Sequence, residues 1–589
     1  MAREMRKATM AFTLLALGLT GCAGGGDDAS AAGRPRDGGT LRVIGSSDVG
    51  HLDPASMASV GAYGLARTFA RTLFGTRASN DFQETIPVRP DVAERIPTRE
   101  NGDISKDRRT YTVRLREGVL WNTEPPRPVT AHDFVRGFKR LCNPASPSPG
   151  KGYFISTLKG MKEFCDGFGS VDAKDAGAIA AYQRDHEVEG LRAKDDRTLV
   201  FDLKQPASDF LNLLTLPYTA AAPQEYDRYV PDSPEFRQNT ISNGPYQITE
   251  YKPGMSYVLT HNPAWRQEAD PLRERHVEKI QITLGQDSPE AVQQQLEQGV
   301  ADLAWDQPVP TSAIPRLRND HRFAIRETPS NSPYLVFNTL SPNNDGALGK
   351  REVRQALQYA IDRSALIKIV GGPSVAKPLH TVIPPGNSGY APANHYPTPN
   401  ESGDPAKCRD LLAKTGHSGL TLKFPYRTNS VHKLIAQSIA ENLDACGVKT
   451  ELMADSGGSF YAGTISTPEN ARKGEWDIAA PGWTPDWYGN NGRSIIQPLF
   501  DGRDYGQNST NYGGYNNPEV NALIDAALTA PDPSHAAGYW QQADQKIMQD
   551  AAIIPLLSRS HTIFHSSRVH GAYFLPTSAG YDYTRLWLN

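Results

Sequence analysis

The sequence predicts an α/β protein of several domains. Three observations lead to this class. Helical and strand patterns alternate over residues 404–453, which is typical of a unit with parallel strands. Short segments such as residues 109–115 place apolar side chains at every second position, which indicates half-buried strands. The length of 589 residues corresponds to about four domains, or fewer large ones, at roughly 150 residues each.

The first half of the chain is expected to contain mostly strands joined by long connections. Residues 246–251 and 256–260 are predicted to form a hairpin. A Ser-Pro pair begins residues 288–299 and a Gly ends them, which is typical of the two ends of a helix. Residues 142–190 show little apolar periodicity and are expected to be an insertion. The other expected strands are residues 39–45, 109–115, 198–203 and 303–305.

The second half alternates between helix and strand patterns more regularly. The apolar residues from Val353 to Ala365 follow helical spacing. Asp404-Pro405 caps a predicted helix that ends near Gly416, and residues 420–426 follow as a strand. The next expected elements are a helix over residues 434–443, a strand over 448–453, and apolar runs over 334–339, 478–483 and 553–557.

The first residues have the three-part pattern of a secretory signal. Arg3, Arg6 and Lys7 form a short basic region, and an apolar run over residues 8–19 follows. This run is too short to span a bilayer. Residues 1–21 are therefore predicted to be a signal peptide.

The apolar run ends in Leu-Thr-Gly followed by Cys22, which resembles the bacterial lipobox, in which the Cys is lipidated and becomes the new amino terminus. A diacylglyceryl group supplies two chains, enough for stable anchoring. Residues 22–37 are predicted to be a flexible tether. We therefore expect an extracytoplasmic lipoprotein anchored to the outer face of the cell membrane. The alternative is an ordinary signal peptide with a chance Cys.

Composition and motifs exclude several classes of function. The chain has 62 Lys and Arg against 65 Asp and Glu, a net charge of -3, so it carries no electrostatic footprint for nucleic acid. No apolar stretch is long enough for a transmembrane helix. GxSxG and HExxH motifs are absent, which disfavours an enzyme. No set of His and carboxylate residues has metal-binding spacing, so no metal and no cofactor is expected.

Four cysteines besides Cys22 allow three pairings. Cys142 and Cys165 bracket an irregular loop, and a disulfide is predicted there, where it would stabilise the fold by about 3 kcal/mol. Cys408 and Cys446 fall in two successive helices that are expected to run parallel, with one Cys near a start and the other near an end. That arrangement favours two buried thiols over a disulfide, and both remain open.

Several short motifs occur in order along nearly the whole chain. They are Gly38-Gly-Thr-Leu-Arg-Val43, Leu52-Asp-Pro54, Tyr111-Thr-Val-Arg-Leu-Arg-Glu-Gly-Val-Leu-Trp121, Val129-Thr-Ala-His-Asp-Phe134, Asn243-Gly-Pro-Tyr246, Val353-Arg-Gln-Ala-Leu-Gln-Tyr-Ala-Ile-Asp-Arg363, Gly482-Trp-Thr-Pro-Asp486 and Tyr515-Asn-Asn-Pro-Glu-Val520. Each motif is weak alone. In this order and spacing, the chain resembles the large extracytoplasmic solute-binding proteins of ABC importers, the peptide/nickel class called family 5.

This resemblance implies a two-lobed fold, similar to type II periplasmic binding proteins, with a third inserted domain and a hinged cleft. The chain crossings near Pro333–Phe337 and Ile554–Leu557 are expected to form the hinge, so that the lobes close on a ligand. The implied boundaries are residues 38–85, 225–332 and 557–589 for lobe I, 86–224 for the small domain, and 333–556 for lobe II.

The resemblance also implies a ligand anchor. In the peptide-binding branch of the family, a carboxylate in a Gly-Trp-x-x-Asp stretch pairs with the peptide α-ammonium, and Asp486 stands at that position. Such a pair forms charge-assisted hydrogen bonds. The remaining contacts to a peptide backbone can be strand-like and independent of sequence. The alternative for Asp486 is a solvated loop acid or a helix cap.

Four further residues are candidates for the cleft. Trp483 is expected to wall it, or else to pack in the core. Gly482 and Thr484 are expected to offer backbone groups to the ligand, or else to form a turn. Some family members carry an Arg where this chain has Ala480. Arg427 lies near the place, though not in strict register, where a dipeptide-binding member carries its Arg, so it is either a carboxylate ligand or a surface residue, and the peptide length is open.

The resemblance implies a monomeric substrate-binding component of an ABC importer, which captures peptides outside the cell and delivers them to a membrane permease. Two alternatives remain. The same fold can bind another solute, such as an oligosaccharide, or the chain can be a peptide-sensing lipoprotein without a role in transport.

Overall fold

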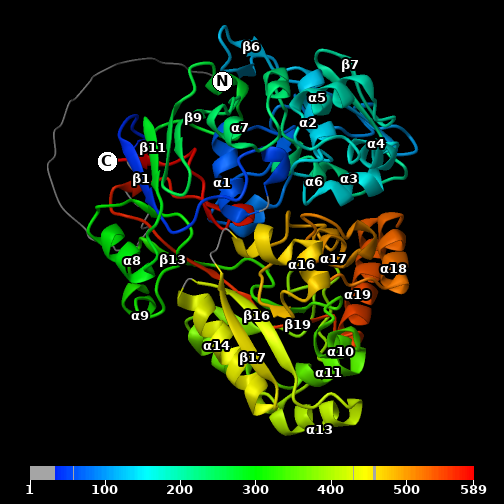
Figure 1. Ribbon diagram of the computed structural model, residues 1–589. Coiled ribbons are helices and arrows are strands. Elements are labelled where there is room, and N and C mark those ends of the chain that lie inside the picture. Colours follow the sequence, from blue (N-terminus) through cyan, green and yellow to red (C-terminus); the bar gives the residue numbers. More distant parts are fainter. Residues whose placement is uncertain (1–33, 58, 429, 456–458) are drawn as a thin grey trace, which may run out of the picture. The chain divides into compact units, whose positions relative to one another are not determined.

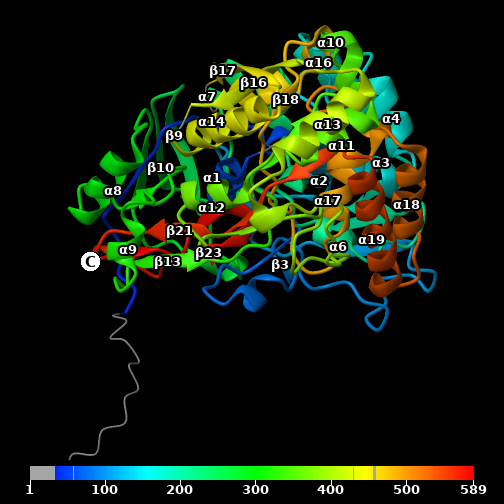
Figure 2. The same ribbon diagram turned by 90° about the horizontal axis from the view of Figure 1, so that it is seen from below.

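The computed structural model describes residues 34–57, 59–428, 430–455 and 459–589. The predicted signal peptide, Cys22 and most of the predicted tether lie outside the described residues. The structure is drawn in Figure 1 and, turned by 90°, in Figure 2.

Lobe I is built on a five-stranded sheet with the strand order β12-β1-β11-β10-β9. In the centre lies β11 (Lys279–Thr283), whose apolar residues at alternate positions are buried. Parallel to it runs β1 (Thr40–Ile44), and β12 (Leu303–Ala304) is parallel to β1. The predicted hairpin is confirmed as β9 (Tyr246–Lys252) and β10 (Ser256–His261), which pair antiparallel.

Helices and the end of the chain complete this lobe. The helices α1 (Val60–Phe69) and α8 (Pro289–Glu297) each begin at a serine, Ser59 and Ser288, whose side chain accepts a backbone N–H of the first turn. This capping satisfies donors that a helix start otherwise leaves unpaired. The carboxy-terminal segment adds the paired strands β22 (Val569–His570) and β25 (Trp587–Leu588), and β23 (Phe574–Leu575) and β24 (Gly580–Tyr581).

The small domain has its own three-stranded antiparallel sheet, in the order β4-β8-β7. The predicted strands 109–115 and 198–203 appear as β4 (Thr110–Arg114) and β8 (Thr198–Asp202), and β7 (Leu191–Asp195) lies at the edge. A capping box at Thr130 and Asp133 begins α2 (Ala131–Arg140), which packs against this sheet.

The structure corrects the prediction of an irregular insertion over residues 142–190. That segment contains α3 (Lys151–Thr157), α4 (Met161–Phe168) and α5 (Ala176–Asp185). Each helix is too short to repeat an apolar pattern more than about twice at 3.6 residues per turn. The helices are held by aromatic side chains in the core of the small domain, so packing stabilises them more than their own periodicity.

Lobe II contains a three-stranded sheet in the order β18-β14-β19. Its strands are β18 (Ile478–Ala479), β14 (Tyr334–Phe337) and β19 (Ile553–Pro555). β16 (Thr421–Arg427) lies beside β18 and pairs parallel with β17 (Lys449–Asp455), as the alternation of residues 404–453 predicts.

One predicted helix of lobe II is two helices in the structure. Apolar residues from Val353 to Ala365 keep helical spacing, but the chain forms α11 (Arg351–Gln358) and then α12 (Arg363–Ile369). The break occurs because the Asp362 side chain accepts the N–H of Ala365 and so caps a new helix. The other long helices are α13 (Pro405–Thr415), α14 (Ser430–Ala445), α17 (Arg493–Phe500), α18 (Pro518–Leu528) and α19 (Pro533–Gln549).

Two short strands lie beside the lobe I sheet. These are β13 (Phe323–Arg326) and β21 (His561–Phe564), which pair antiparallel and lie side by side in Figure 2. The segments expected to form the hinge, residues 333–337 and 554–557, are neighbours in the structure, because β14 and β19 pair antiparallel. β20 (Leu557–Arg559) follows β19 and pairs with β15 (Ala376–Pro378).

Both cysteine pairs are bonded in the structure. Cys142 follows α2 and Cys165 lies in α4, with their Cα atoms 5.1 Å apart. Cys408 and Cys446 are also joined, at a Cα separation of 5.7 Å, so the expectation of a gap too long to bridge is wrong. The reason is that α13 lies across the end of α14 rather than along it, which brings its first turn to the end of α14 (Figure 1).

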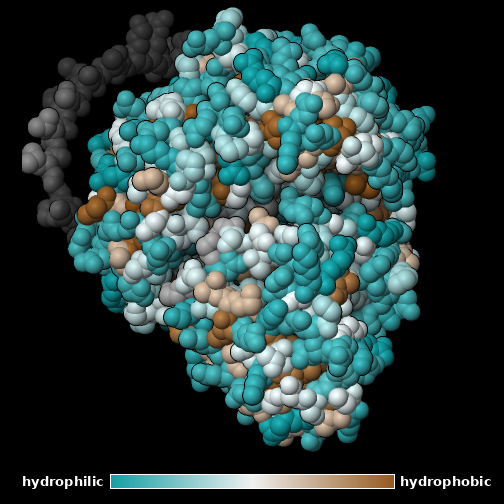
Figure 3. Space-filling model, viewed as in Figure 1, coloured by the Kyte–Doolittle hydropathy of each residue, from teal (hydrophilic) through white to brown (hydrophobic). Residues whose placement is uncertain are grey.

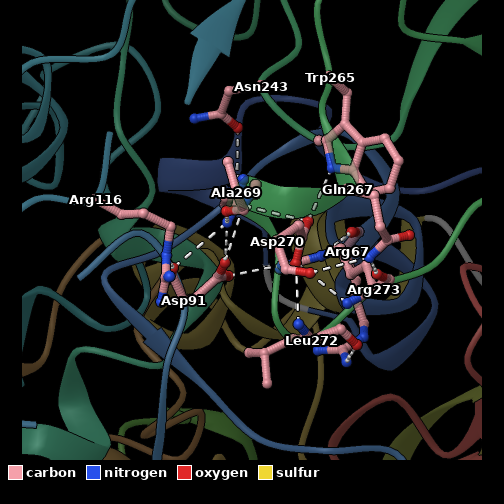
Figure 4. Close-up of polar contacts among 12 residues, drawn as sticks. Arg67, Asp91, Arg116, Asn243, Trp265, Gln267, Ala269, Asp270, Leu272 and Arg273 are labelled. Atoms are coloured by element: carbon pink, nitrogen blue, oxygen red, sulfur yellow. Dashed lines mark hydrogen bonds and ion pairs between the residues drawn. The ribbon is translucent and has the colours of Figure 1, made fainter. Parts of the chain in front are cut away.

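A buried charge network holds the start of the small domain to lobe I (Figure 4). Nη1 of Arg273 lies 2.8 Å from Oδ2 of Asp91 and 3.3 Å from Oδ1 of Asp270. Nη2 of Arg71 lies 2.8 Å from Oδ1 of Asp91. Burial disfavours the ionised form of Asp270, but Arg71 and Arg273 outweigh it and hold the pKa of its carboxyl at about 2. The network therefore contributes to stability only while every member stays charged.

The remaining strands and α-helices of the described residues are short. They are β2 (Phe74–Gly75), β3 (Arg89–Pro90), β5 (Leu120–Trp121), β6 (Arg127–Pro128), α6 (Phe210–Leu213), α7 (Pro234–Gln238), α9 (Ile314–Leu317), α10 (Asn343–Gly346) and α16 (Pro468–Lys473). On the face drawn in Figure 3, hydrophobic residues are scattered among hydrophilic ones. No helix in the described part of the chain is long and apolar enough to cross a membrane.

Candidate functional site

Asp486 lies where all three parts of the fold meet. Its side chain comes from lobe II, and Asp486 is only 7% exposed. The hydroxyl of Tyr153, on α3 of the small domain, donates to Oδ2 at 2.7 Å, and that of Tyr218 lies 3.3 Å from Oδ1. The hydroxyl of Tyr63, on α1 of lobe I, is hydrogen-bonded to that of Tyr218. Asp486 is therefore neither a solvated loop acid nor a helix cap.

The carboxylate of Asp486 has tyrosine partners but no cation. Burial raises the pKa of Asp486 to about 6, although the hydrogen bonds from Tyr153, Tyr218 and Tyr63 lower it in part. No Lys, Arg or His of the described residues forms an ion pair with it. A buried charge that lacks a counter-ion is costly. The site is therefore completed either by a proton or by a cationic group of a ligand.

A pocket opens beside this carboxylate. Its empty volume is about 750 Å³, counting space open to solvent. Tyr63 and Thr72 of lobe I, Leu216 of the small domain, and Asp486 and Tyr488 of lobe II all line it. The pocket thus has walls from each part of the fold, as a site that opens and closes with a hinge requires.

Trp483 is partly buried and anchored. Its indole Nε1–H donates to the carbonyl of Ser494 at 2.8 Å, and its ring packs against a helical core cluster of lobe II. Its backbone N–H and C=O are both bonded to Asn331. These contacts fit the core-packing alternative for Trp483 and fix the backbone that precedes Asp486.

Gly482 and Thr484 differ in their surroundings. The N–H of Gly482 donates to the hydroxyl of Tyr461 at 3.2 Å, so this backbone donor is occupied. A Cβ at Gly482 would lie 2.5 Å from Oγ of Ser332, so a larger residue would displace the Ser332 side chain. Thr484 is partly buried, and its backbone and side chain make no hydrogen bond to the described residues.

Arg427 is not a free surface residue. Its guanidinium lies over the rings of Phe460 and Tyr461, 5.4 Å from each centroid. Nη2 donates to the carbonyl of Ala480 at 3.2 Å and lies 3.2 Å from Nδ1 of His432. Nε is buried without a hydrogen-bond partner among the described residues. Arg427 thus lies at the end of β16 and contacts the stretch that follows β18 and leads to Asp486.

Tyr512 lies near enough to Arg427 and Asp486 for both charges to affect its pKa. Burial is the main cause that raises this pKa well above the usual value. Its ring lies 6.1 Å from that of Tyr461. The hydroxyl of Tyr512 has no hydrogen-bond partner in the part of the chain that the structure describes.

Arg493 connects lobe II to the small domain through hydrogen bonds and an ion pair. It belongs to α17, which faces α3 across the lobe boundary (Figure 1). Its Nη2 donates to the carbonyl of Tyr153 at 2.9 Å and to Oγ1 of Thr157 at 2.7 Å. Nη1 lies 3.2 Å from Oδ1 of Asp209. Tyr153 therefore contacts both Arg493, through its carbonyl, and Asp486, through its hydroxyl.

Sequence reasoning missed Tyr63, Tyr153, Tyr218 and Arg493. They lie far apart in the chain and belong to no local motif, so only the fold brings them together. In the described residues, no group of three or more His, Cys, Asp or Glu side chains is placed to hold a metal ion.

Comparison with known proteins places the chain among solute-binding proteins. The family model described as bacterial extracellular solute-binding proteins, family 5 Middle, matches residues 87–506. The periplasmic oligopeptide-binding protein OppA of Salmonella typhimurium is 26% identical over 569 residues, which cover 94% of each chain. The probable deoxycholate-binding periplasmic protein YgiS of Escherichia coli is 24% identical over 80% of this chain and 79% of its own.

Solved structures share the fold. The clavulanic acid biosynthesis oligopeptide binding protein 2 superposes with a TM-score of 0.76 at 25% identity, covering 94% of this chain and 96% of its own. The Haemophilus influenzae OppA complex with the peptide RPPGFSPFR gives a TM-score of 0.75 at 18% identity, with 94% and 99% covered. The two-lobed fold with an inserted domain is therefore established.

Proposed function

Because the chain belongs to the bacterial extracellular solute-binding proteins of family 5, we propose that it is the substrate-binding component of an ABC importer. It captures extracellular peptides between its lobes and delivers them to a membrane permease. The observation that carries this proposal is the buried carboxylate of Asp486, which has three tyrosines around it and no cation.

A peptide amino end fits this site chemically. An α-ammonium has three donors, and Asp486 offers carboxylate oxygens in a setting where burial strengthens a charge-assisted hydrogen bond. Tyr153 and Tyr218 bring the small domain to the same carboxylate. A ligand bound there contacts both lobes, which is how binding energy is coupled to closure.

We also propose that the protein works outside the cytoplasm. The names of the relatives place them in the periplasm. We propose that this chain is exported by residues 1–21 and anchored by lipid on Cys22. It acts as a monomer without a cofactor, metal or catalytic activity.

Two other roles remain to be separated from this one. In the first, the protein binds a solute other than a peptide, such as an oligosaccharide. One relative is named for binding deoxycholate. The buried Asp486 argues against an anion such as deoxycholate at that point, since two like charges would be left in a site of low dielectric. A peptide-sensing lipoprotein without transport would use the same site.

Native mass spectrometry of the purified protein tests the proposal. We expect co-purified ligands that form a set of peptide masses. A single sugar or sterol mass in place of the peptides would contradict it. A peptide set with no effect of gene deletion on peptide uptake would instead identify a sensor.

A further inference from the structure

Apolar side chains form a large part of the pocket beside Asp486. They come from lobe I, the small domain and the carboxy-terminal segment, and are Ala66, Ala70, Leu216, Pro217, Leu575 and Pro576. Two aromatic residues of lobe II, Trp487 and Tyr488, also line the pocket. Its empty volume of about 750 Å³, which counts space open to solvent, is large enough for an aromatic side chain. Burying apolar atoms of a ligand against these walls is favourable.

Charged residues that line the pocket are paired, with the exception of Asp486. Nε of Arg67 lies 2.9 Å from Oδ2 of Asp582. Nη1 of Arg273 lies 2.8 Å from Oδ2 of Asp91 (Figure 4). The buried network of lobe I adds one more arginine and one more aspartate, so these positive and negative charges balance. A charged side chain of a ligand therefore finds no unpaired partner at these arginines.

Several hydroxyls of the pocket wall already donate hydrogen bonds within the protein. The hydroxyls of Thr72, Thr85 and Thr215 each donate to a backbone carbonyl two or three residues away, at 2.5, 2.6 and 2.7 Å. The hydroxyl of Tyr63 is bonded to that of Tyr218. A ligand side chain that needs hydrogen-bond donors gains none from the three threonines and loses those of water.

The position of the pocket relative to Asp486 identifies which part of a peptide reaches it. In a peptide, the first side chain branches from the same Cα atom that carries the α-ammonium. An ammonium bound to Asp486 therefore places this side chain at the pocket that Asp486 itself lines. An acidic first side chain would bring a second carboxylate close to Asp486 in a buried setting, which is costly.

We propose that this pocket binds the first side chain of the peptide and selects a large uncharged one, either aromatic or branched aliphatic. This inference rests on the proposed peptide-binding function. The contacts to the peptide backbone stay independent of sequence, and the pocket adds selectivity at one position. Because the walls come from both lobes and the small domain, a side chain that fills the pocket also favours the closed form.

Tripeptides that differ only in their first residue test the pocket. The first residue is Phe, Ala, Gln or Glu, two alanines follow, and calorimetry at pH 7 measures the dissociation constants. We expect the wild type to bind the Phe peptide at least about tenfold more tightly than the Ala peptide, because the ring is buried. The Glu peptide should bind more weakly than its neutral partner, the Gln peptide, by about tenfold.

A variant that fills the pocket tests the location. Thr577 lines the pocket, is partly buried, and makes no hydrogen bond through its side chain to the described residues. Thr577→Phe adds bulk there and should remove most of the difference between the Phe and Ala peptides. The matched control is Thr249→Phe, at an exposed position of β9 outside the pocket, which should keep the difference.

A second readout uses the wild type alone. Burial of apolar surface makes the heat-capacity change of binding more negative, so the Phe peptide should give a more negative value than the Ala peptide. Equal affinities and equal heat-capacity changes for these two peptides would overturn the pocket inference and leave peptide binding intact. Binding of no free-amino peptide would overturn the proposed function as well, so the two failures are distinct.

Discussion

The hydroxyl of Tyr153 donates a 2.7 Å hydrogen bond to Oδ2 of Asp486 and so joins the small domain to lobe II. The carbonyl of Tyr153 also accepts a hydrogen bond from Arg493, which is fully buried. The carboxylate that is proposed to bind the ligand is therefore also part of the contact that closes the cleft. Any change in the charge of Asp486 should affect both.

Peptide binding should weaken in mild acid. The pKa of Asp486 in the ligand-free protein is about 6, and an ammonium needs the ionised form. Between pH 7 and pH 5 the ionised fraction falls from about nine-tenths to about one-tenth, so the dissociation constant should rise about tenfold. Calorimetry at a series of pH values measures this. An affinity that is constant from pH 7 to pH 5 would contradict the assignment, and Asp486→Asn should show no such dependence.

Loss of Asp270 from its buried network should destabilise lobe I. Asp270→Asn leaves Arg71 and Arg273 short of a counter-charge and should lower the free energy of unfolding by about 3–5 kcal/mol. Denaturant titration measures the loss. The control is Asp166→Asn, since Asp166 pairs only with Lys162 on the surface of α4, and it should change little.

The acid response of this network has a defined sign. The pKa of Asp270 is depressed in the fold, so its contribution is complete above the unfolded value near 4 and is lost as the pH falls through about 2. Wild type and Asp270→Asn should therefore converge in stability as the pH approaches 2. A gap that stays constant down to pH 2 would disagree with this assignment.

Both disulfides should be found in the exported protein. Peptide mapping without reduction should recover Cys142 linked to Cys165 and Cys408 linked to Cys446. In the chain-entropy model each bond stabilises the fold by about 3–4 kcal/mol, since the loops span 23 and 38 residues. Free thiols at Cys408 and Cys446 in freshly secreted protein would contradict the second disulfide and favour two buried thiols.

Anchoring should depend on Cys22. Its replacement by Ser should release the protein into the medium or the periplasm, because the lipid chains supply the membrane attachment. Cell fractionation with a control at Ser30→Ala, which leaves the lipobox and both cysteine pairs intact, checks the result. Retention of Cys22→Ser on the membrane would rule out lipid on this residue.

The sequence allowed the alternating part of lobe II to be predicted because its elements are long or clearly capped. β16, α14 and β17 have seven or more residues each, and Asp404 and Gly416 mark the ends of α13. The break between α11 and α12 was missed because Asp362 caps a helix inside a run that keeps helical spacing. α3 and α4 were missed because they are too short to show a repeat.

Only part of the site could be predicted from the sequence. Asp486 was found through a family motif, and the structure gives it a buried setting. Tyr63, Tyr153 and Tyr218 could not be found because 155 residues separate the first from the last, and no local pattern marks a hydroxyl that will face a carboxylate.

The most direct test of the central claim is calorimetry on four combinations of protein and peptide. Wild type and Asp486→Asn are each titrated with a free-amino peptide and with its N-acetylated form. A charge-assisted hydrogen bond of about 1.5–3 kcal/mol corresponds to about ten- to a hundredfold in dissociation constant. We expect each single change to cost at least about tenfold, and the two losses not to add, because both remove one interaction. Equal binding of the free-amino peptide by wild type and Asp486→Asn would show that Asp486 is not the anchor.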